Sequence, residues 1–312
     1  MSSGAQYQER RIINWSEYNG ALTNRGSLTF WLGEDLPELW FDREPKAAGS
    51  RGLHRTFSDH AIQMCLTFKA LFHLAYRQTE GFVNSVFALG GIGLKSPDYT
   101  ALAKRAKHLE VAIPVLRRDE PVHVVVDSTG LKVYGEGEWK VRQHGIGKRR
   151  TWRKLHLAVD AERHEILGVE LTRLETADCE VLPALLQQSA DQPIASICGD
   201  GAYDNRETYR EAEARGATAV VPPRSGAALW QPGHARNAAV EACRSEGRSA
   251  WKRAAGYHRR SNAETAMFRY KQILGPCLSA RLPDTQITEA DVGVSVLNRM
   301  NRLGMPKRAS QG

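Results

Sequence analysis

Cysteine is scarce and scattered in this chain, which excludes the classes of fold that depend on it. The five cysteines are Cys65, Cys179, Cys198, Cys243 and Cys277, and no two of them form a C-x-x-C pair. An odd number at wide spacing argues against a disulfide framework and against a cysteine zinc site. We therefore expect buried, reduced thiols.

Long apolar runs are absent as well. No stretch approaches the ~20 apolar residues that a membrane-spanning helix needs, and the first residues, MSSGAQYQERR, lack a secretory apolar segment. We expect a protein of the cytoplasm with no membrane partner.

Two common catalytic motifs are also missing. The chain has no G-x-S-x-G, the turn that carries the nucleophile of many serine hydrolases. The pair Gly147-Lys148 has Arg142 where a phosphate-binding P-loop needs glycine and Arg149 where it needs serine or threonine. A serine hydrolase of that type and a nucleotide-driven enzyme are therefore poorly supported.

An excess of basic residues is present. The 312 residues include 43 Lys and Arg against 35 Asp and Glu, for a net charge of +8 and a pI near 9.3. Such a balance favours polyanionic partners, of which nucleic acid is the commonest. The length suggests one sizeable domain with a smaller one added.

The first third of the chain has helical patterning. Residues 1–50 read as an irregular arm with short helices at best, and residues 58–110 as helical, with Ser58 as a cap. Ser96-Pro97-Asp98 predicts a second helix start, with Ser96 as cap, and that helix carries Lys104 and Arg105. Helix, glycine-rich loop and basic helix are compatible with a helix-turn-helix DNA reader, although an ordinary helical pair fits the same pattern.

From residue 121 the pattern changes to strands and then to alternating strands and helices. A mixed sheet flanked by helices is therefore predicted. The expected strands are 122–126, 131–134, 139–142, 152–159, 165–171, 194–198 and 218–221. The expected helices are 177–190 and 206–215, most of 237–275, and 288–303.

Two aspartates follow predicted strands. Asp127 is predicted to end the strand 122–126, and Asp200 follows the strand 194–198 between two glycines. Ligands in open sheets gather at the carboxyl ends of parallel strands, so these acids could share a hard divalent cation. Each could equally be a turn aspartate; Asp160 fits a hairpin tip, and Asp204 with Glu207 fits a helix capping box.

A third acid belongs to a helical pattern. Tyr257, Arg260, Glu264 and Lys271 fall within an arc of about 60° on one helix at about 100° per residue. One carboxylate among cations suits a metal ion beside DNA phosphates. The rival interpretation is a capping box, Ser261-x-x-Glu264, which would leave Tyr257 and Arg260 outside the helix.

At these residues the chain resembles a known family, the DDE transposases of bacterial insertion sequences, in the insertion-sequence-five group. The family signature Y-(2)-R-(3)-E-(6)-K is matched without a gap by Tyr257, Arg260, Glu264 and Lys271. Other similar segments are 127–135 and 199–204 around the two aspartates, 148–156, Tyr18-Asn19 with 25–29, and 296–300. The resemblance spans roughly residues 14 to 306.

The resemblance implies a ribonuclease-H-like catalytic core with Asp127, Asp200 and Glu264 as the catalytic and metal-binding triad. It implies two divalent ions, Mg²⁺ or Mn²⁺, which assist cleavage at the element's end and attack of the freed 3′-OH on target DNA. The partners would be double-stranded DNA, both terminal inverted repeats and target, and a second copy in a homodimeric synaptic complex. The place of action would be the bacterial nucleoid.

On this basis we divide the chain into three parts. Residues 1–115 are predicted to be the N-terminal arm and helical DNA-binding region, residues 116–306 the catalytic domain, and residues 307–312 a tail. The expected DNA contacts lie in the signature, in a basic tract and in the second N-terminal helix: Tyr257, Arg260, Lys271, Lys148, Arg149, Arg150, Trp152, Arg153, Lys154, Lys104 and Arg105. A solvated basic hairpin is the alternative for the tract.

Two other functions remain open from the sequence. One is a catalytically inactive protein that still binds the inverted repeats, as a repressor-like derivative would. The other is a metal-dependent nuclease of the same fold, which would cut DNA without joining it.

Overall fold

The computed structural model describes residues 12–43, 56–133 and 152–307. Within these ranges, three short helices open the chain, α1 (Trp15–Asn24), α2 (Leu28–Leu32) and α3 (Leu36–Leu39). They are followed by α4 (Asp59–Leu71), α5 (Tyr76–Leu89) and α6 (Tyr99–Arg105). The predicted short helices and helical region are thus confirmed. No helix of the described ranges is long and apolar enough to cross a membrane.

The helix caps follow local sequence at one of the two predicted positions. Ser58 caps α4, because its side chain accepts a hydrogen bond from the Ala61 amide at 3.1 Å. The prediction of Ser96 as the cap of α6 is wrong. Asp98 caps that helix and accepts from the Thr100 and Ala101 amides at 2.8 and 3.0 Å. Its carboxylate is the stronger acceptor and lies closer to the helix.

One mixed sheet forms the centre of the region from residue 122 onwards. Its strands run in the order β3-β2-β1-β4-β5, with β6 paired to the far end of β1. The neighbours of β1 are antiparallel on the β2 side and parallel on the β4 side. The strands are β1 (Val122–Val133), β2 (Trp152–Asp160), β3 (Ile166–Thr172), β4 (Ile194–Cys198), β5 (Thr218–Val220) and β6 (Cys277–Leu278).

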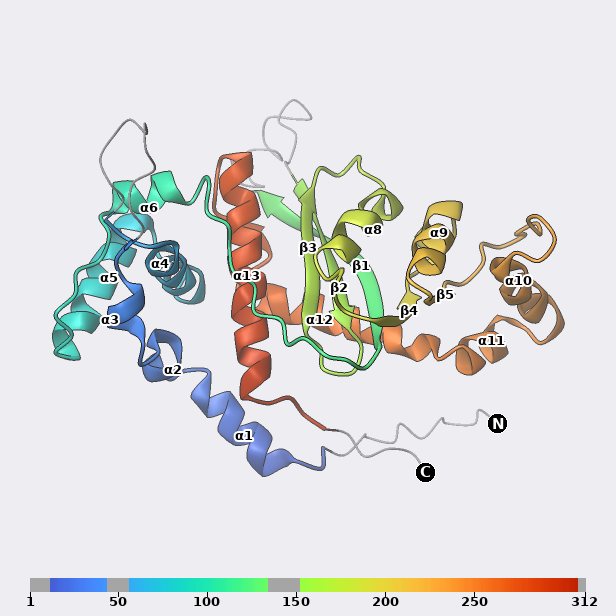
Figure 1. The fold of residues 1–312 in the computed structure, drawn as a ribbon, viewed down its shortest axis with the longest axis horizontal. Coiled ribbons are helices and arrows are strands. Elements are labelled where there is room, and N and C mark those ends of the chain that lie inside the picture. The colour runs from blue at the N-terminus through green and yellow to red at the C-terminus, as the bar shows by residue number, and fades with distance from the viewer. Residues whose placement is uncertain (1–11, 44–55, 134–151, 308–312) are drawn as a thin grey trace, which may run out of the picture.

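Alternation along β1 assigns its two faces to two layers of helices. The even positions Val122, Val124 and Val126 pack in a cluster with α8 (Asp178–Gln187) and α9 (Arg206–Ala214). The odd positions Val125 and Leu131 pack in another cluster with α12 (Ser261–Ile273) and α13 (Pro283–Leu303). The predicted mixed sheet flanked by helices is confirmed. Two further helices, α10 (Ala235–Ser245) and α11 (Arg248–Ala254), lie at the right of Figure 1.

Helix α13 is shared by two hydrophobic cores. Ala290, Val294 and Leu297 pack against the sheet. Val292, Val296 and Met300 pack into a separate core formed by the N-terminal helices. In Figure 1 this helix accordingly stands between α4–α6 and the sheet.

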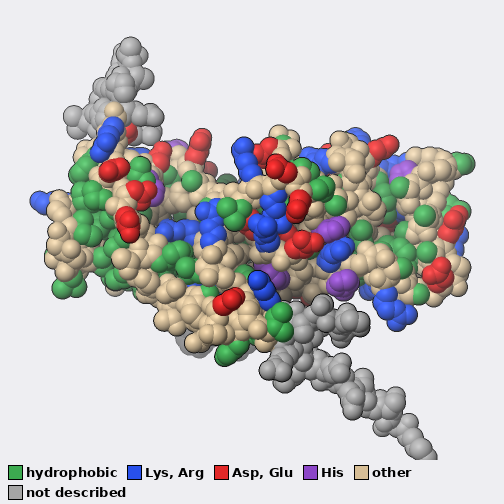
Figure 2. Space-filling model, turned by 60° about the horizontal axis from the view of Figure 1, so that its bottom comes forward, with side chains coloured by type: hydrophobic (Ala, Val, Ile, Leu, Met, Phe, Trp, Pro, Cys, Tyr) green, Lys and Arg blue, Asp and Glu red, His purple; other side chains and the backbone are tan. Residues whose placement is uncertain are grey.

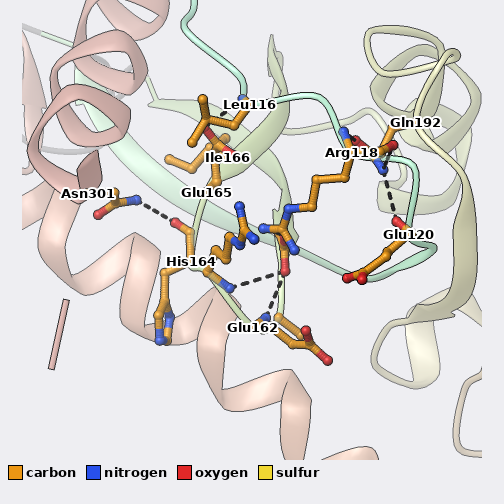
Figure 3. A network of polar contacts seen from close by, with 12 residues as sticks. Leu116, Arg118, Glu120, Glu162, His164, Glu165, Ile166, Gln192 and Asn301 are labelled. Atoms are coloured by element: carbon orange, nitrogen blue, oxygen red, sulfur yellow. Dashed lines mark hydrogen bonds and ion pairs between the residues drawn. The ribbon is translucent and has the colours of Figure 1, made fainter. Parts of the chain in front are cut away.

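A polar network fastens the segment before β1 to the β2–β3 turn (Figure 3). The buried Asp160 accepts from the Arg118 guanidinium at 2.6 Å and from the Glu162 amide at 2.8 Å. Glu165 accepts from the Leu116 amide at 3.0 Å. Asp160 is therefore a turn aspartate, as predicted.

One predicted strand boundary is wrong. Strand β1 does not end before Asp127 but continues to Val133, because β2 pairs with it through Ser128↔His156, Gly130↔Lys154 and Lys132↔Trp152. Tertiary pairing overrides the turn composition of Ser128-Thr129-Gly130. The strand predicted at 139–142 lies outside the described residues. The separate strand predicted at 131–134 is also wrong, because residues 131–133 form the end of β1, whereas the strands predicted at 152–159, 165–171, 194–198 and 218–221 appear with ends shifted by no more than two residues.

Candidate active site

Register places the two aspartates side by side. Val125 of β1 is paired in parallel with Cys198 of β4, and Asp127 and Asp200 each follow two residues later. Side chains two apart point to the same face of a strand. Asp127 therefore points to the face of Val125, which α12 covers, and Asp200 leaves β4 on that same side. The Asp200 carboxylate accepts from the Ala202 amide at 2.8 Å, which starts the short helix η1 (Gly201–Tyr203).

The edge of β1 is open where these acids lie. Among the described residues, this edge has strand partners only at Val122–Val125, through β4, and at Lys132–Val133, through β6. At the interruption, Arg260 and Lys271 reach β1 at Asp127 and Thr129. The interruption leaves room for side chains of β1 and α12 to meet.

The signature residues of α12 face this interruption. Arg260 contacts Asp127 of β1 at 3.2 Å and also Glu264, one turn further along its own helix. Lys271 donates to the Thr129 hydroxyl at 2.6 Å, two residues beyond Asp127 on the same face of β1. The helix thus directs a carboxylate, a guanidinium and an ammonium to one line of side chains on the sheet.

The capping-box alternative for Ser261 is excluded. Residues 257–260 form a 3-10 turn, η2 (Tyr257–Arg260), that runs directly into α12. Ser261 is itself helical, and its hydroxyl donates to the His258 carbonyl at 2.9 Å. Tyr257 packs against Trp251, with ring centroids 6.1 Å apart. Tyr257 and Arg260 therefore belong to the same helical segment as Glu264.

The acids influence one another electrostatically. Burial raises the pKa of Asp127, the Arg260 charge and the Ser128 amide lower it, and the charges of Asp200 and Glu264 raise it further. Burial also raises the pKa of Tyr257 to about 12, and the negative charges of Asp200 and Asp127 add to that rise. All three acids therefore act within one neighbourhood.

The donor set fits a hard divalent cation, but the acids are not assembled around one position. Within the described ranges, no three His, Cys, Asp or Glu side chains are grouped closely enough to hold a metal ion. The Arg260 guanidinium lies against both Asp127 and Glu264 and so neutralises them in place of a cation. Carboxylate oxygens of this kind are the ligands that Mg²⁺ and Mn²⁺ prefer.

A buried ion pair anchors the loop that carries Asp200. Arg236 of α10 donates to Asp204 at 2.7 Å, and both side chains are almost fully buried. The Arg224 amide adds a third hydrogen bond to Asp204, at 3.0 Å. The predicted capping box of Asp204 and Glu207 is therefore wrong: Asn205 caps α9, because Asp204 is already engaged by Arg236.

The other predicted DNA contacts are not gathered at the acids. Arg153 donates to Gln286 at 2.9 Å, and Lys154 pairs with Asp178 at 2.9 Å. Arg105 is bound to Asp59, whereas Lys104 is exposed. The predicted contact Trp152 lies beside Lys132, whose Nζ is 5.6 Å from the centroid of the Trp152 ring. The predicted contacts Lys148, Arg149 and Arg150 lie outside the described residues.

Two residues at this site were not predicted from the sequence. Thr129 holds Lys271, and its position two residues after Asp127 is the signal that could have revealed it. Tyr203 is buried, and the charges of Asp178, Asp127 and Asp200 raise the pKa of its hydroxyl beyond the effect of burial. Its ring packs so closely on Gly199 that an added Cβ there would lie 2.7 Å away. Glycine before Asp200 is therefore a packing requirement.

Comparisons with known proteins agree with this geometry. Two family models, both described as "Transposase DDE domain", match residues 23–136 and 118–290. The second match covers more than half of the chain and spans Asp127, Asp200 and Glu264.

Several solved structures resemble the chain weakly. A piggyBac transposase synaptic complex with hairpin DNA has 7% identity and a TM-score of 0.39, over 93% of this chain and 76% of that one. The Mos1 strand transfer complex has 11% identity and a TM-score of 0.23, over 77% of this chain and 83% of that one. These scores are too low to support a conclusion by themselves. The second family match, over residues 118–290, establishes that the chain belongs to the DDE transposases, and the matched stretch contains every strand of the mixed sheet described above.

Proposed function

We propose that this transposase binds the terminal inverted repeats of its own insertion sequence and catalyses metal-dependent cleavage and strand transfer of DNA. The observation that carries the proposal is the bridging of Asp127 and Glu264 by Arg260, on the face of the sheet to which Asp200 also belongs. This arrangement supports one reaction centre built from three distant parts of the chain.

Asp127, Asp200 and Glu264 would hold two divalent ions, Mg²⁺ or Mn²⁺. When bound, these ions would supply activation of the attacking oxygen and neutralisation of the leaving 3′ oxygen. Of the two acids paired with Arg260, Asp127 is the more buried, with 16% of its side chain exposed against 56% for Glu264. From that difference we expect the Asp127 side chain to be held in place at the centre of the site, and the Glu264 side chain to be free to adjust its position.

The basic residues of the signature would position the DNA. Arg260 has a planar guanidinium that suits two phosphate oxygens, once it leaves the carboxylates. Lys271 is held by Thr129 at 2.6 Å and would place a point charge further along the same strand of DNA. Tyr257 keeps its proton at neutral pH, because its pKa is raised to about 12, and so can donate a hydrogen bond to a phosphate oxygen.

We further propose a division of labour. The N-terminal helices, up to residue 115, would recognise the inverted repeats, and residues 116–306 would carry out the chemistry. Two copies would pair two element ends as a homodimer. The two hydrophobic cores, one for the N-terminal helices and one for the sheet, support such a division.

The test uses the full chain and duplex DNA that ends in the element's terminal sequence. With Mg²⁺ or Mn²⁺ we expect nicking at the element end and joining of the 3′ end to a target plasmid. Asp127→Asn, Asp200→Asn and Glu264→Gln should each abolish both steps and leave repeat binding unchanged. Binding without nicking by the unmodified protein would indicate the inactive, repeat-binding alternative. Nicking without joining would indicate the nuclease.

A further inference from the structure

On the face turned forward in Figure 2, basic and acidic side chains are interspersed, so the chain's net charge of +8 is not presented there as one continuous patch. A DNA backbone must then be held by local groups of cations. One such group lies away from the acids, in a groove of about 630 Å³ between the N-terminal helices and the catalytic region.

The groove has a basic rim. One wall carries Lys69 and His73 at the end of α4 and Lys107 just after α6, and the other carries Arg281 in the turn between β6 and α13. None of the described residues that line it is acidic. His73, Lys107 and Arg281 are exposed, and neither Lys107 nor Arg281 forms an ion pair with a described residue. Four basic groups without acidic partners favour an anionic occupant.

The two walls are joined at the bottom of the groove. Lys69 donates to the Ser279 hydroxyl at 3.0 Å, and so links α4 to the segment after β6. Glu289, which lines the adjoining cavity, accepts hydrogen bonds from the Ser279 and Ala280 amides at 2.8 and 2.7 Å. The groove is therefore held together by the Lys69–Ser279 hydrogen bond, and the carboxylate of Glu289 beside it is already hydrogen-bonded.

Helix α12 and strand β1 both run from the acids towards residues that adjoin the groove. On α12, Glu264 and Leu274 are ten residues apart, which is about 15 Å at ~1.5 Å per residue. Leu274 lines a cavity that adjoins the groove and shares Lys69 and Thr285 with it. On β1, Asp127 and Lys132 are five residues apart, about 17 Å at ~3.4 Å per residue, and Lys132 pairs with Cys277 of β6, two residues before Ser279 of the groove. Both elements thus place residues that adjoin the groove about 15–17 Å from the acids.

We infer that this groove, rimmed by Lys69, His73, Lys107 and Arg281, holds the sugar-phosphate backbone of the DNA about five base pairs from the phosphodiester that is cut. Phosphates along one strand are spaced at about 3.4 Å of rise, so ~15–17 Å corresponds to roughly five of them. The inference rests on the proposed function, because it takes the cut DNA to lie at Asp127 and Glu264.

The first experiment measures the salt dependence of binding. The probe is a fluorescein-labelled 30-base-pair duplex of mixed sequence, in EDTA and at KCl concentrations from 50 to 200 mM. Lys107→Gln/Arg281→Gln should bind roughly tenfold more weakly at 100 mM KCl, and its log–log salt slope should be shallower by about 2, at ~0.9 per lost phosphate contact. Lys107→Arg/Arg281→Lys should keep the slope of the unmodified protein.

The matched control removes the same two charges elsewhere. Arg117 and Arg210 are exposed on 85% and 71% of their side chains and pair with surface acids away from the groove. Arg117→Gln/Arg210→Gln should change the affinity by less than twofold. Equal slopes for the two double variants overturn the inference. Altered self-association in Lys107→Gln/Arg281→Gln with an unchanged DNA slope overturns it too, and identifies a second copy as the occupant.

A second experiment locates the contact. On a duplex cut by the unmodified protein, hydroxyl-radical protection between about four and six base pairs from the nick should be lost in Lys107→Gln/Arg281→Gln, while protection at the nick remains. Protection that is retained there overturns the position assigned to the groove. If the unmodified protein neither binds nor nicks any duplex, the proposed function itself is wrong. That result is distinct from a wrong assignment of the groove, in which the unmodified protein still binds and nicks DNA.

Discussion

Replacing Arg260 by glutamine should make the protein bind Mn²⁺ more tightly while cleavage of DNA falls. In the structure the guanidinium contacts Asp127 at 3.2 Å and also Glu264, so it neutralises two of the three acids that a divalent ion would use. An ion that enters the site must first displace it. The side chain that positions DNA is thus also the side chain that competes with the metal.

The size of the effect follows from exposure. Asp127 and Arg260 have 16% and 23% of their side chains exposed, and a charged hydrogen bond in such a place contributes about 1.5 kcal/mol. Glu264 is 56% exposed, so its i,i+4 pair with Arg260 contributes only about 0.4 kcal/mol. Without both interactions, the ion no longer has to displace the guanidinium, and its binding free energy improves by roughly 2 kcal/mol. This corresponds to about 30-fold tighter binding of the ion.

The assay is a titration of Mn²⁺ into the protein without DNA, followed by electron paramagnetic resonance of the free ion. Lys271→Gln is the control, because Lys271 contacts Thr129 and forms an ion pair with no described carboxylate, and it should shift the dissociation constant by less than twofold. If Arg260→Gln binds Mn²⁺ no more tightly than the unmodified protein, the guanidinium does not compete with the ion and the reasoning is refuted.

Three further outcomes concern stability. Asp204→Asn leaves Arg236 buried without its charge partner and should cost about 3–5 kcal/mol in urea unfolding; a loss below about 1 kcal/mol would contradict the role of this pair. Burial lowers the pKa of His156 to about 4, below the 6.5 of the unfolded chain. As the pH falls from 6.5 towards 4, the unfolded state alone takes up this proton, so stability should fall by up to about 3 kcal/mol, and His156→Gln should remove that part of the pH dependence. Gly168→Ala would place a Cβ 2.4 Å from a backbone oxygen of α8 and should destabilise by about 1–3 kcal/mol, whereas Gly81→Ala in α5 meets nothing within 4 Å and should be neutral or slightly stabilising.

Much of the fold could be predicted from local pattern. The strand predicted at 194–198 coincides with β4, and the hairpin of β2 and β3 and the helix after Ser58 also appear where expected. These elements are predictable because each has its own periodicity or cap. The length of β1 was not, because Ser128-Thr129-Gly130 has turn composition and becomes strand only through pairing with β2.

The site likewise contains residues that local sequence predicted and residues that it could not predict. Helical spacing was sufficient to place Arg260, Glu264 and Lys271 on one side of a helix, and they do face the sheet. Asp204 could not be assigned, because its partner Arg236 is 32 residues away and local sequence favoured a cap. The roles of Thr129 and Lys69 likewise depend on partners 142 and 210 residues distant, which no local pattern encodes.

The position of α13 at the end of the described chain has a consequence for shortened copies of this protein. Its 21 residues supply one stripe to the core of the sheet and the opposite stripe to the core of the N-terminal helices. A gene interrupted before codon 283 would therefore leave both cores uncovered and yield no folded fragment from either half. A repeat-binding derivative without catalysis would have to arise by substitution at the acids rather than by loss of the C-terminal part.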